Sequence, residues 1–434
     1  MRRLGHVPAL DGLRGIAILL VLMRHTFVPA RWALGGSLGV DLFFVLSGFL
    51  ITSLLIGEWS SSGTLSLRSF YRRRARRLLP ALLAFVGVAL VVSVALHPGR
   101  APSFVWLAAL RLSYASNFLA AFTRQGVGTG FKHLWSLAEE EQFYLLWPIL
   151  LVALLRRGRR PRVILGSLLA VAFAVNLERL LVVAHGASIA RVWFAPDTHA
   201  DPIMYGCAAG IIYSYRIFLV PKRLAELAGV AAAAIVAVYT QTDGRVGFYP
   251  IVLLPVFCVA VAVFLLGVAE HDIGARALSA RPLVAFGAIS YALYLWHPLT
   301  LNYFGPAGMP IAILLAAVSY VVVEEPFMRR RRQSATANST AINGDVAVGG
   351  GVTGLTERVA VAPFAPDGSA VAANGIAPVS PSTLVGLSAT VTLTVPSPER
   401  AKSARLSHPS GVGVPHPPVR VSAPSAITSS STKL

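Results

Sequence analysis

The stretch LDGLRGIAILLVLMRHTF, residues 10–27, decides the fold of this chain. It is apolar enough to form a membrane-spanning helix, yet it contains Asp11, Arg14 and His25. On a helix Arg14 and His25 share one face, about 16 Å apart along the axis, and Asp11 lies within about 40° of His25. Ionisable groups are costly inside hydrocarbon and usually mark a substrate or proton path. The stretch therefore predicts a membrane protein with a functional site among its helices.

The composition of the whole chain agrees with a membrane protein. Only 13% of the 434 residues are charged, where soluble domains carry roughly 25%, and the mean hydropathy is +0.66. The net charge of +19 comes from short basic clusters between apolar runs, which favours topology marking over nucleic-acid binding. Cys207 and Cys258 lie in apolar segments, so we expect neither a disulfide framework nor a metal site.

Apolar runs predict an all-α fold, a polytopic membrane helix bundle of about ten transmembrane helices within residues 1–332. Each run approaches the ~20 residues that cross the hydrocarbon. The expected helices cover residues 9–28, 38–57, 79–97, 140–155, 163–184, 202–218, 224–240, 248–268, 284–304 and 309–328.

The basic clusters predict the orientation of this bundle. With ten helices both termini lie on one side, and that side also receives the clusters at 68–77, 156–162 and 329–332. Because cytoplasmic loops carry the excess of Lys and Arg, we expect a multi-pass protein of the cell membrane with both termini in the cytoplasm.

Residues 333–434 have a different composition. They are rich in Ala, Val, Ser, Thr, Pro and Gly, and Phe364 is their one aromatic residue. Such a segment cannot bury enough apolar surface to offset its ordering entropy. We therefore expect a disordered, low-complexity cytoplasmic tail.

Six further segments place polar residues within or beside the expected helices. They are GVDLFFVLSGFLIT (39–52), FYRRRARRLLP (70–80), HLWSLAEEEQFYLLWP (133–148), DTHAD (197–201), GAISYALYLWHP (287–298) and SYVVVEEPF (319–327). With Asp11, their candidate pocket residues are Asp41, Ser47, His133, Trp135, Glu140, Tyr144, Asp201, Ser290, Tyr294, His297 and Glu324.

Each segment also has a plain structural interpretation. The basic cluster at 70–77 suits phosphate binding and suits a positive-inside anchor equally well. Aromatic residues are common at the membrane interface, and carboxylates at a helix N-terminus complement the helix dipole. His297 could be a packing histidine, and Arg14 could extend to the cytoplasmic interface.

Taken together, these blocks resemble the acyltransferase-3 family of integral-membrane O-acyltransferases. The resemblance covers residues 8 to about 330 and rests on LDGLRGIAILLVLMRH, GVDLFFVLSGFLI, YRRRARRLLP, WSLAEEEQFYLLWP, ISYALYLWH and the EEP at 324–326. It departs from the family pattern at His199, where many members have Arg, and at Ala288.

The resemblance implies transfer of an acyl group, commonly acetyl, from acyl-CoA as co-substrate to a hydroxyl of an envelope polysaccharide, glycolipid or related sugar. It implies Arg14 and His25 as the essential pair, and from the carboxylate run at 139–141 we add Glu141 as a further catalytic candidate. It also implies Arg76, Arg77 and Pro80 on the acyl-CoA side, and we add Arg73 for the CoA phosphates. No bound cofactor and no metal are expected, and the partners are membrane lipid, acyl-CoA and the glycan or glycolipid acceptor.

Three interpretations remain open at this point. His25 acts either as a general base on the acceptor hydroxyl or as a transient acyl carrier. A transporter or flippase for a glycan or lipid also suits buried polar residues, but it predicts repeats and broken helices that the sequence does not display. A non-catalytic membrane partner would use the tail at 333–434 for recruitment.

Overall fold

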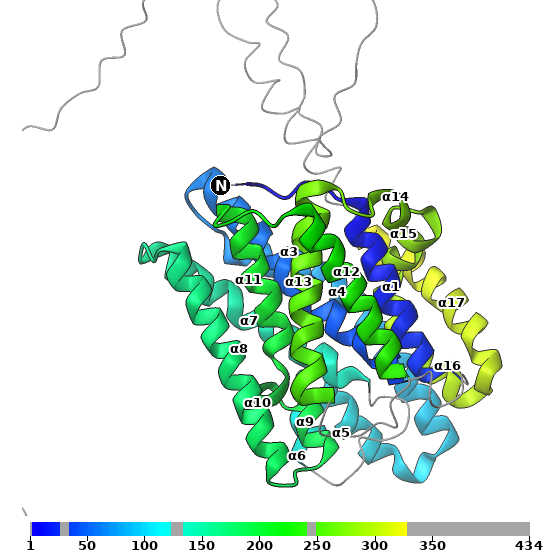
Figure 1. Cartoon of the computed structure of the whole chain (residues 1–434). Helices are drawn as coiled ribbons and strands as arrows, with labels where there is room; N and C mark the ends of the chain where they lie inside the picture. Colours follow the sequence, from blue (N-terminus) through cyan, green and yellow to red (C-terminus); the bar gives the residue numbers. More distant parts are fainter. Residues whose placement is uncertain (1, 27–33, 123–132, 241–248, 328–434) are drawn as a thin grey trace, which may run out of the picture. The chain divides into compact units, whose positions relative to one another are not determined.

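The computed structural model describes residues 2–26, 34–122, 133–240 and 249–327 (Figure 1). Within these ranges the chain is helical and contains no strand, so the all-α prediction is confirmed for them. The expected tail at 333–434, and its boundary with the membrane domain, lie outside the described residues.

In the described residues, nine helices of 15 or more residues and one of 12 residues form most of the bundle. They are α1 (Pro8–His25), α3 (Leu38–Ser62), α4 (Leu67–Leu96), α7 (Leu134–Arg156), α8 (Pro161–Ala184), α11 (Asp201–Tyr215), α12 (Lys222–Thr240), α13 (Leu254–His271), α16 (Ser290–Phe304) and α17 (Gly308–Ser319). Shorter segments connect them: η1 (Leu34–Ser37), η2 (Pro98–Arg100), α5 (Ala101–Leu112), α6 (Ser116–Phe122), α9 (Ile189–Phe194), α10 (Pro196–His199), η3 (Tyr249–Leu253), α14 (Ala275–Leu278), α15 (Arg281–Ala288), η4 (Gly305–Ala307) and η5 (Tyr320–Glu324).

Several helical stretches are long and apolar enough to cross a membrane. In the described residues there are six: Gly35–Ser62, Leu67–Leu96, Pro161–Ala184, Lys222–Thr240, Tyr249–His271 and Ser290–Phe327. A seventh is possible by length if Pro98–Leu112 and Ser116–Phe122, which bend by 112°, count as one span. Their number indicates a multi-pass membrane protein.

Two helix boundaries differ from the expected ones in ways that affect the interior. α4 begins at Leu67 rather than near residue 79, because Ser66 caps it by accepting a hydrogen bond from the backbone N–H of Ser69. The basic cluster is therefore part of the helix. The expected helix at 284–304 is broken at Ile289, between α15 and α16.

Glycines allow two helix pairs to approach closely. α11 packs along α3, and a Cβ on Gly48 would collide with the backbone carbonyl of Ile203, while a Cβ on Gly206 would collide with that of Val45. α1 packs along α15 in the same way through Gly15 and Gly287. In membranes such small residues let helices gain packing energy that bulkier side chains would prevent.

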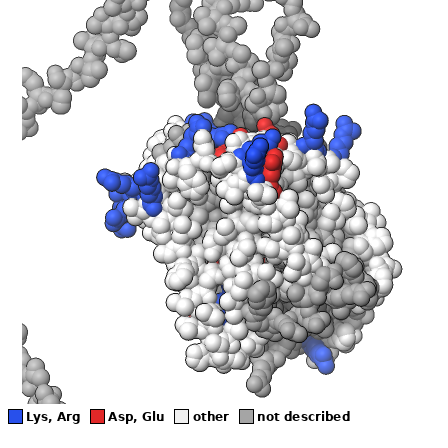
Figure 2. Space-filling model, in the orientation of Figure 1, with Lys and Arg blue, Asp and Glu red and all other residues white. Residues whose placement is uncertain are grey.

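Charge is distributed along the bundle axis. Figure 2 shows Lys and Arg gathered mainly at the end where the N-terminus lies, above sides that are almost free of charge. The apolar sides and the basic end are the pattern expected of a protein surrounded by lipid.

Candidate active site

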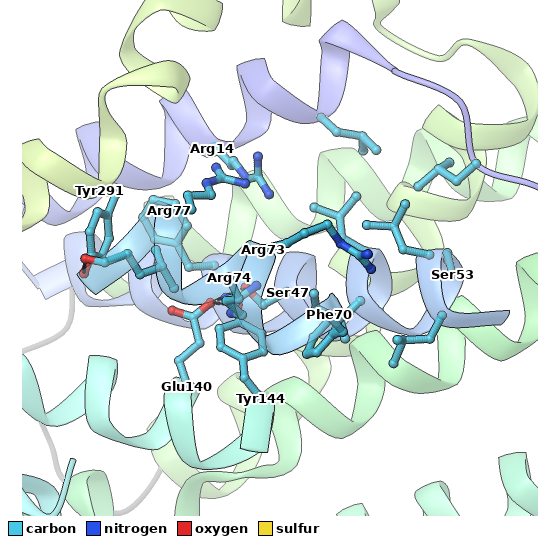
Figure 3. A pocket seen from close by; sticks show the side chains of 18 of the residues that line it. Arg14, Ser47, Ser53, Phe70, Arg73, Arg74, Arg77, Glu140, Tyr144 and Tyr291 are labelled. Carbon is cyan, nitrogen blue, oxygen red and sulfur yellow. Dashed lines mark hydrogen bonds between the residues drawn. The ribbon is translucent and has the colours of Figure 1, made fainter. Parts of the chain in front are cut away.

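A cavity of about 1090 Å³ opens inside the bundle, between α1, α3, α4, α7 and α16. It contains eleven of the predicted site residues: Asp11, Arg14, Ser47, Arg73, Arg76, Arg77, Glu140, Glu141, Tyr144, Ser290 and Tyr294. Figure 3 shows the arginines of α1 and α4 directed toward the polar side chains of α3 and α7. Motifs far apart in the sequence therefore meet in one space.

The cavity carries an excess of positive charge. Seven arginines line it against four carboxylates, and five of the arginines come from α4. Some of the charge is paired, since Arg73 contacts Glu58 at 3.0 Å and Arg14 contacts Asp11 at 3.1 Å. The remaining guanidinium groups offer planar, bidentate donors of the kind that bind phosphate.

A serine, a glutamate and a tyrosine are hydrogen-bonded within the cavity. The hydroxyl of Tyr144 donates to Ser47 Oγ at 2.7 Å, and both hydroxyls contact Glu140 Oε1. The guanidinium of Arg74 lies over the Tyr144 ring, and its Nε is 3.9 Å from Glu141. Arg74 was not among the predicted site residues, although it belongs to the predicted cluster.

His25 does not line this cavity. It ends α1 in contact with His297, at 5.0 Å between ring centroids, and His297 in turn contacts His133 at 5.7 Å. Arg14 and His25 therefore belong to two neighbouring polar regions, with three histidines from α1, α16 and the start of α7 in the second. The described residues include no group of His, Cys, Asp and Glu arranged to hold a metal ion.

Backbone contacts fix the tautomers of two of these histidines. Nδ1 of His25 lies 2.9 Å from the carbonyl of Val21, and Nδ1 of His297 lies 2.9 Å from that of Leu293. Because a carbonyl only accepts, each Nδ1 carries a hydrogen, and in the neutral imidazole each Nε2 then keeps a lone pair. Nε2 of the fully buried His297 has no hydrogen-bond partner in the described part of the chain.

Tyr294 lies between the two polar regions. It lines the cavity, its ring centroid is 5.2 Å from that of His133 and 5.8 Å from that of His297, and its hydroxyl is hydrogen-bonded to Ser136. Ser136 also lines the cavity and was not predicted. No signal in the sequence distinguished it from a helix-surface serine.

Asp41, Trp135 and Asp201 lie in a separate buried network. His199 is 3.0 Å from Asp41 and 3.6 Å from Glu139, and its ring contacts Trp135. Asp201 pairs with Arg179, which is fully buried in α8. This network holds α3, α7, α8 and α11 together rather than lining the cavity.

Arg179 is the clearest residue that the sequence analysis missed. Its Nε donates to the carbonyl of Thr198 at 2.6 Å and its NH1 to that of Pro250 at 2.7 Å. An arginine within the apolar run 163–184 was the available signal, because a charge at that depth normally has a buried partner.

Beyond the histidines and the buried network, two further predicted residues do not line the cavity. Pro80 lies inside α4, one turn beyond the arginines, and does not line the cavity. Glu324 ends η5, buried against α4, and does not line it either.

Comparisons with known proteins agree on one family. A family model described as an acyltransferase domain, of the acyltransferase-3 type, matches residues 7–323. The peptidoglycan O-acetyltransferase OatA of Listeria monocytogenes is 30% identical over 341 residues, which cover 74% of this chain and 54% of that protein. The O-acetyltransferase OatA of Staphylococcus aureus is 33% identical over 361 residues, covering 75% of this chain and 58% of that protein.

The match to these relatives is partial in length. The aligned region spans little more than half of each curated relative. No solved structure matches the chain.

Proposed function

This chain belongs to the acyltransferase-3 family, and on that premise we propose that it transfers an acyl group from acyl-CoA to a hydroxyl of an envelope glycan. The observation that carries the donor assignment is the arginine-rich cavity. CoA bears several phosphates and a long pantetheine arm, so it needs both a cationic mouth and a deep, partly apolar channel. The cavity offers these together.

The donor's phosphates bind Arg73, Arg76 and Arg77 on α4 in this proposal. Charge-assisted bonds from guanidinium groups are about twice as strong as neutral ones, and they match phosphate geometry. The pantetheine arm extends past Arg14, whose positive charge can stabilise either a phosphate or the oxygen of the reacting carbonyl. Glu141, beside Arg74, helps to keep the cationic wall in position.

The acyl transfer itself takes place near the histidines. The oxygen of the acceptor hydroxyl attacks the thioester carbon, the carbon–sulfur bond breaks, and the CoA thiolate leaves. Nε2 of His25 receives the hydroxyl proton. It can do so because Nδ1 donates to the carbonyl of Val21, which leaves the lone pair of the neutral ring on Nε2. The reacting carbonyl then has to lie beside Tyr294, and the acceptor hydroxyl has to reach it from the histidine side of that ring, because His25 does not line the cavity.

The proposed topology has ten membrane spans and both termini in the cytoplasm. The helices α1, α7 and α11 lie in the bundle beside the longer apolar ones, and α16 and α17 pack on each other as separate helices. The basic end of the bundle then faces the cytoplasm, where acyl-CoA is found. In this proposal residues 1–332 are the membrane acyltransferase domain, and residues 333–434 follow it on the cytoplasmic side.

The test is donor-to-acceptor transfer by the intact chain in lipid nanodiscs. Acetyl-CoA labelled in its acetyl group is supplied with peptidoglycan fragments first, because one relative is named for that polymer. We expect alkali-labile label on the glycan with wild-type protein and none with His25→Ala. Uptake of glycan into sealed proteoliposomes that contain the chain, without labelling, would instead support a transporter, for which the helix break at Ile289 is the favouring observation.

A further inference from the structure

Two helices, α7 and α16, form the inner end of the cavity, and their last lining residues are in contact. Along α16 the lining residues are Ser290, Tyr291 and Tyr294, and His297, almost one turn further on, does not line it. Along α7 the lining likewise ends at Ser136, and His133 lies beyond it. The two terminal residues, Ser136 and Tyr294, are hydrogen-bonded to each other.

The Tyr294 side chain is held in place by hydrogen bonds at its hydroxyl and by packing against its ring. Its hydroxyl donates to the backbone carbonyl of His133 and is hydrogen-bonded to the Ser136 hydroxyl, which reaches the same carbonyl at 3.3 Å. The rings of His133 and His297 pack against the Tyr294 ring on the side away from the cavity. A phenol ring fixed in this way cannot turn aside without breaking hydrogen bonds between α7 and α16.

The surface that a donor's acyl group would meet is therefore rigid. Leu137 and Phe43 line the cavity and belong to the same hydrophobic cluster as Tyr294, so this ring has apolar neighbours. His133 and His297 are fully or almost fully buried behind it. A chain longer than the available space would have to displace packed side chains, which costs more than its own burial gains.

We infer that Tyr294 is the residue that limits the donor to short acyl groups such as acetyl. The inference rests on the proposed binding of acyl-CoA in this cavity, and it adds the acyl chain length, which the sequence left open. The terminal methyl of an acetyl group rests against the Tyr294 ring, while the additional methylenes of butyryl or hexanoyl find no room.

Binding of acyl-CoA thioesters to the full chain in nanodiscs tests this inference. Dissociation constants are measured for CoA and for acetyl-, butyryl- and hexanoyl-CoA with the wild type and with Tyr294→Ala. We expect butyryl-CoA to bind the wild type at least about tenfold more weakly than acetyl-CoA. Tyr294→Ala removes the whole phenol ring, so the preference for acetyl-CoA over the longer thioesters should disappear. If the longer chains fill the space that the ring leaves, the preference should reverse, with affinity rising by about fourfold per added methylene.

Two further variants make the comparison specific. Tyr291→Ala is the matched control, because Tyr291 lines the same cavity from the same helix, one position after Ser290, and bonds a backbone carbonyl, that of Leu78. We expect it to retain the preference for acetyl-CoA. Tyr294→Phe keeps the ring and should also retain that preference. If Tyr294→Ala loses its fold, Tyr294→Leu provides the same comparison.

The failure of this inference can be told apart from failure of the proposed function. If no thioester and no CoA bind the wild type, the donor assignment fails, and the inference with it. If acetyl-CoA binds but butyryl- and hexanoyl-CoA bind the wild type equally well, only the inference is overturned. The inference is also overturned if Tyr294→Ala keeps the wild-type preference for acetyl-CoA. It is overturned as well if Tyr291→Ala loses that preference to the same extent as Tyr294→Ala.

Discussion

The imidazole rings of His25 and His297 meet edge to face, with 5.0 Å between their centroids. One ring ends the first helix of the chain and the other lies in α16, near the end of the described residues. Both rings bond a carbonyl four residues earlier through Nδ1, so both have Nε2 free for proton transfer. This pairing of two motifs far apart in the sequence underlies the first prediction.

Replacing His25 by Ala should abolish acyl transfer, because loss of a general base typically costs about 10²–10⁴ in rate. Donor affinity should be unchanged, since His25 does not line the cavity. His185→Ala is the control, because His185 makes the same contact to a carbonyl four residues earlier but is exposed and outside the cluster. Rates of label transfer and dissociation constants for acetyl-CoA check both statements. Near-normal transfer by His25→Ala would remove the catalytic role.

Replacing Arg76 and Arg77 together by Ala should weaken acetyl-CoA binding by about a hundredfold or more, since hydrogen bonds to charged groups are worth about 1.5–3 kcal/mol each. The loss should shrink at high salt, where the wild type also binds less tightly. Arg159 and Arg160 provide the control pair, because they lie in another basic cluster that does not line the cavity. Calorimetric titration measures the affinities. An equal loss of acetyl-CoA affinity in the two double variants would indicate that the α4 cluster serves only as a membrane anchor.

Replacing Arg179 by Met should destabilise the fold by about 3–5 kcal/mol, because it leaves the Asp201 carboxylate buried without its cation. The double variant Arg179→Met with Asp201→Leu should recover much of that loss. Lys222→Ala, which removes an exposed pair with Glu226, should change stability by less than about 1 kcal/mol. Thermal unfolding in detergent ranks the three. A single variant as stable as Lys222→Ala would contradict the importance of the buried pair.

Replacing Gly48 by Ala should cost about 1–3 kcal/mol, because the added methyl group would push α11 away from α3. Gly166→Ala is the matched control on α8, where a Cβ meets no neighbouring atom within 4 Å. It should be neutral or slightly stabilising, since Ala favours helix over Gly. Melting temperatures of the two variants decide the matter, and equal values would show that the helices can move apart freely.

The sequence predicted the helices well because hydrocarbon imposes their length. Each of the ten apolar runs overlaps a helix or helix pair in the described residues, although only six or seven helical stretches there are long and apolar enough to span a membrane. The errors lie where polar residues continue a helix out of the apolar zone, as at Leu67 in α4, or where a helix breaks inside an apolar run, as at Ile289. Hydropathy does not register either event.

The sequence predicted which residues form the site better than it predicted how those residues are arranged. Eleven predicted residues line one cavity, because charged side chains in apolar helices must face inward. The sequence could not show that His25 lies beyond the floor at Tyr294, since helical periodicity relates residues on one helix only. The partners of Asp201 and Asp41 were missed for the same reason: Arg179 and His199 come from other segments.

The length of α4 has a consequence for measurements of donor binding. Its 30 residues extend over about 45 Å, where the hydrocarbon is only about 30 Å thick. The arginine-bearing turns therefore lie among lipid headgroups, whose phosphates are ligands for the same guanidinium groups. Anionic lipid then competes with the donor, and the affinity measured for acyl-CoA depends on the bilayer in which the protein is studied.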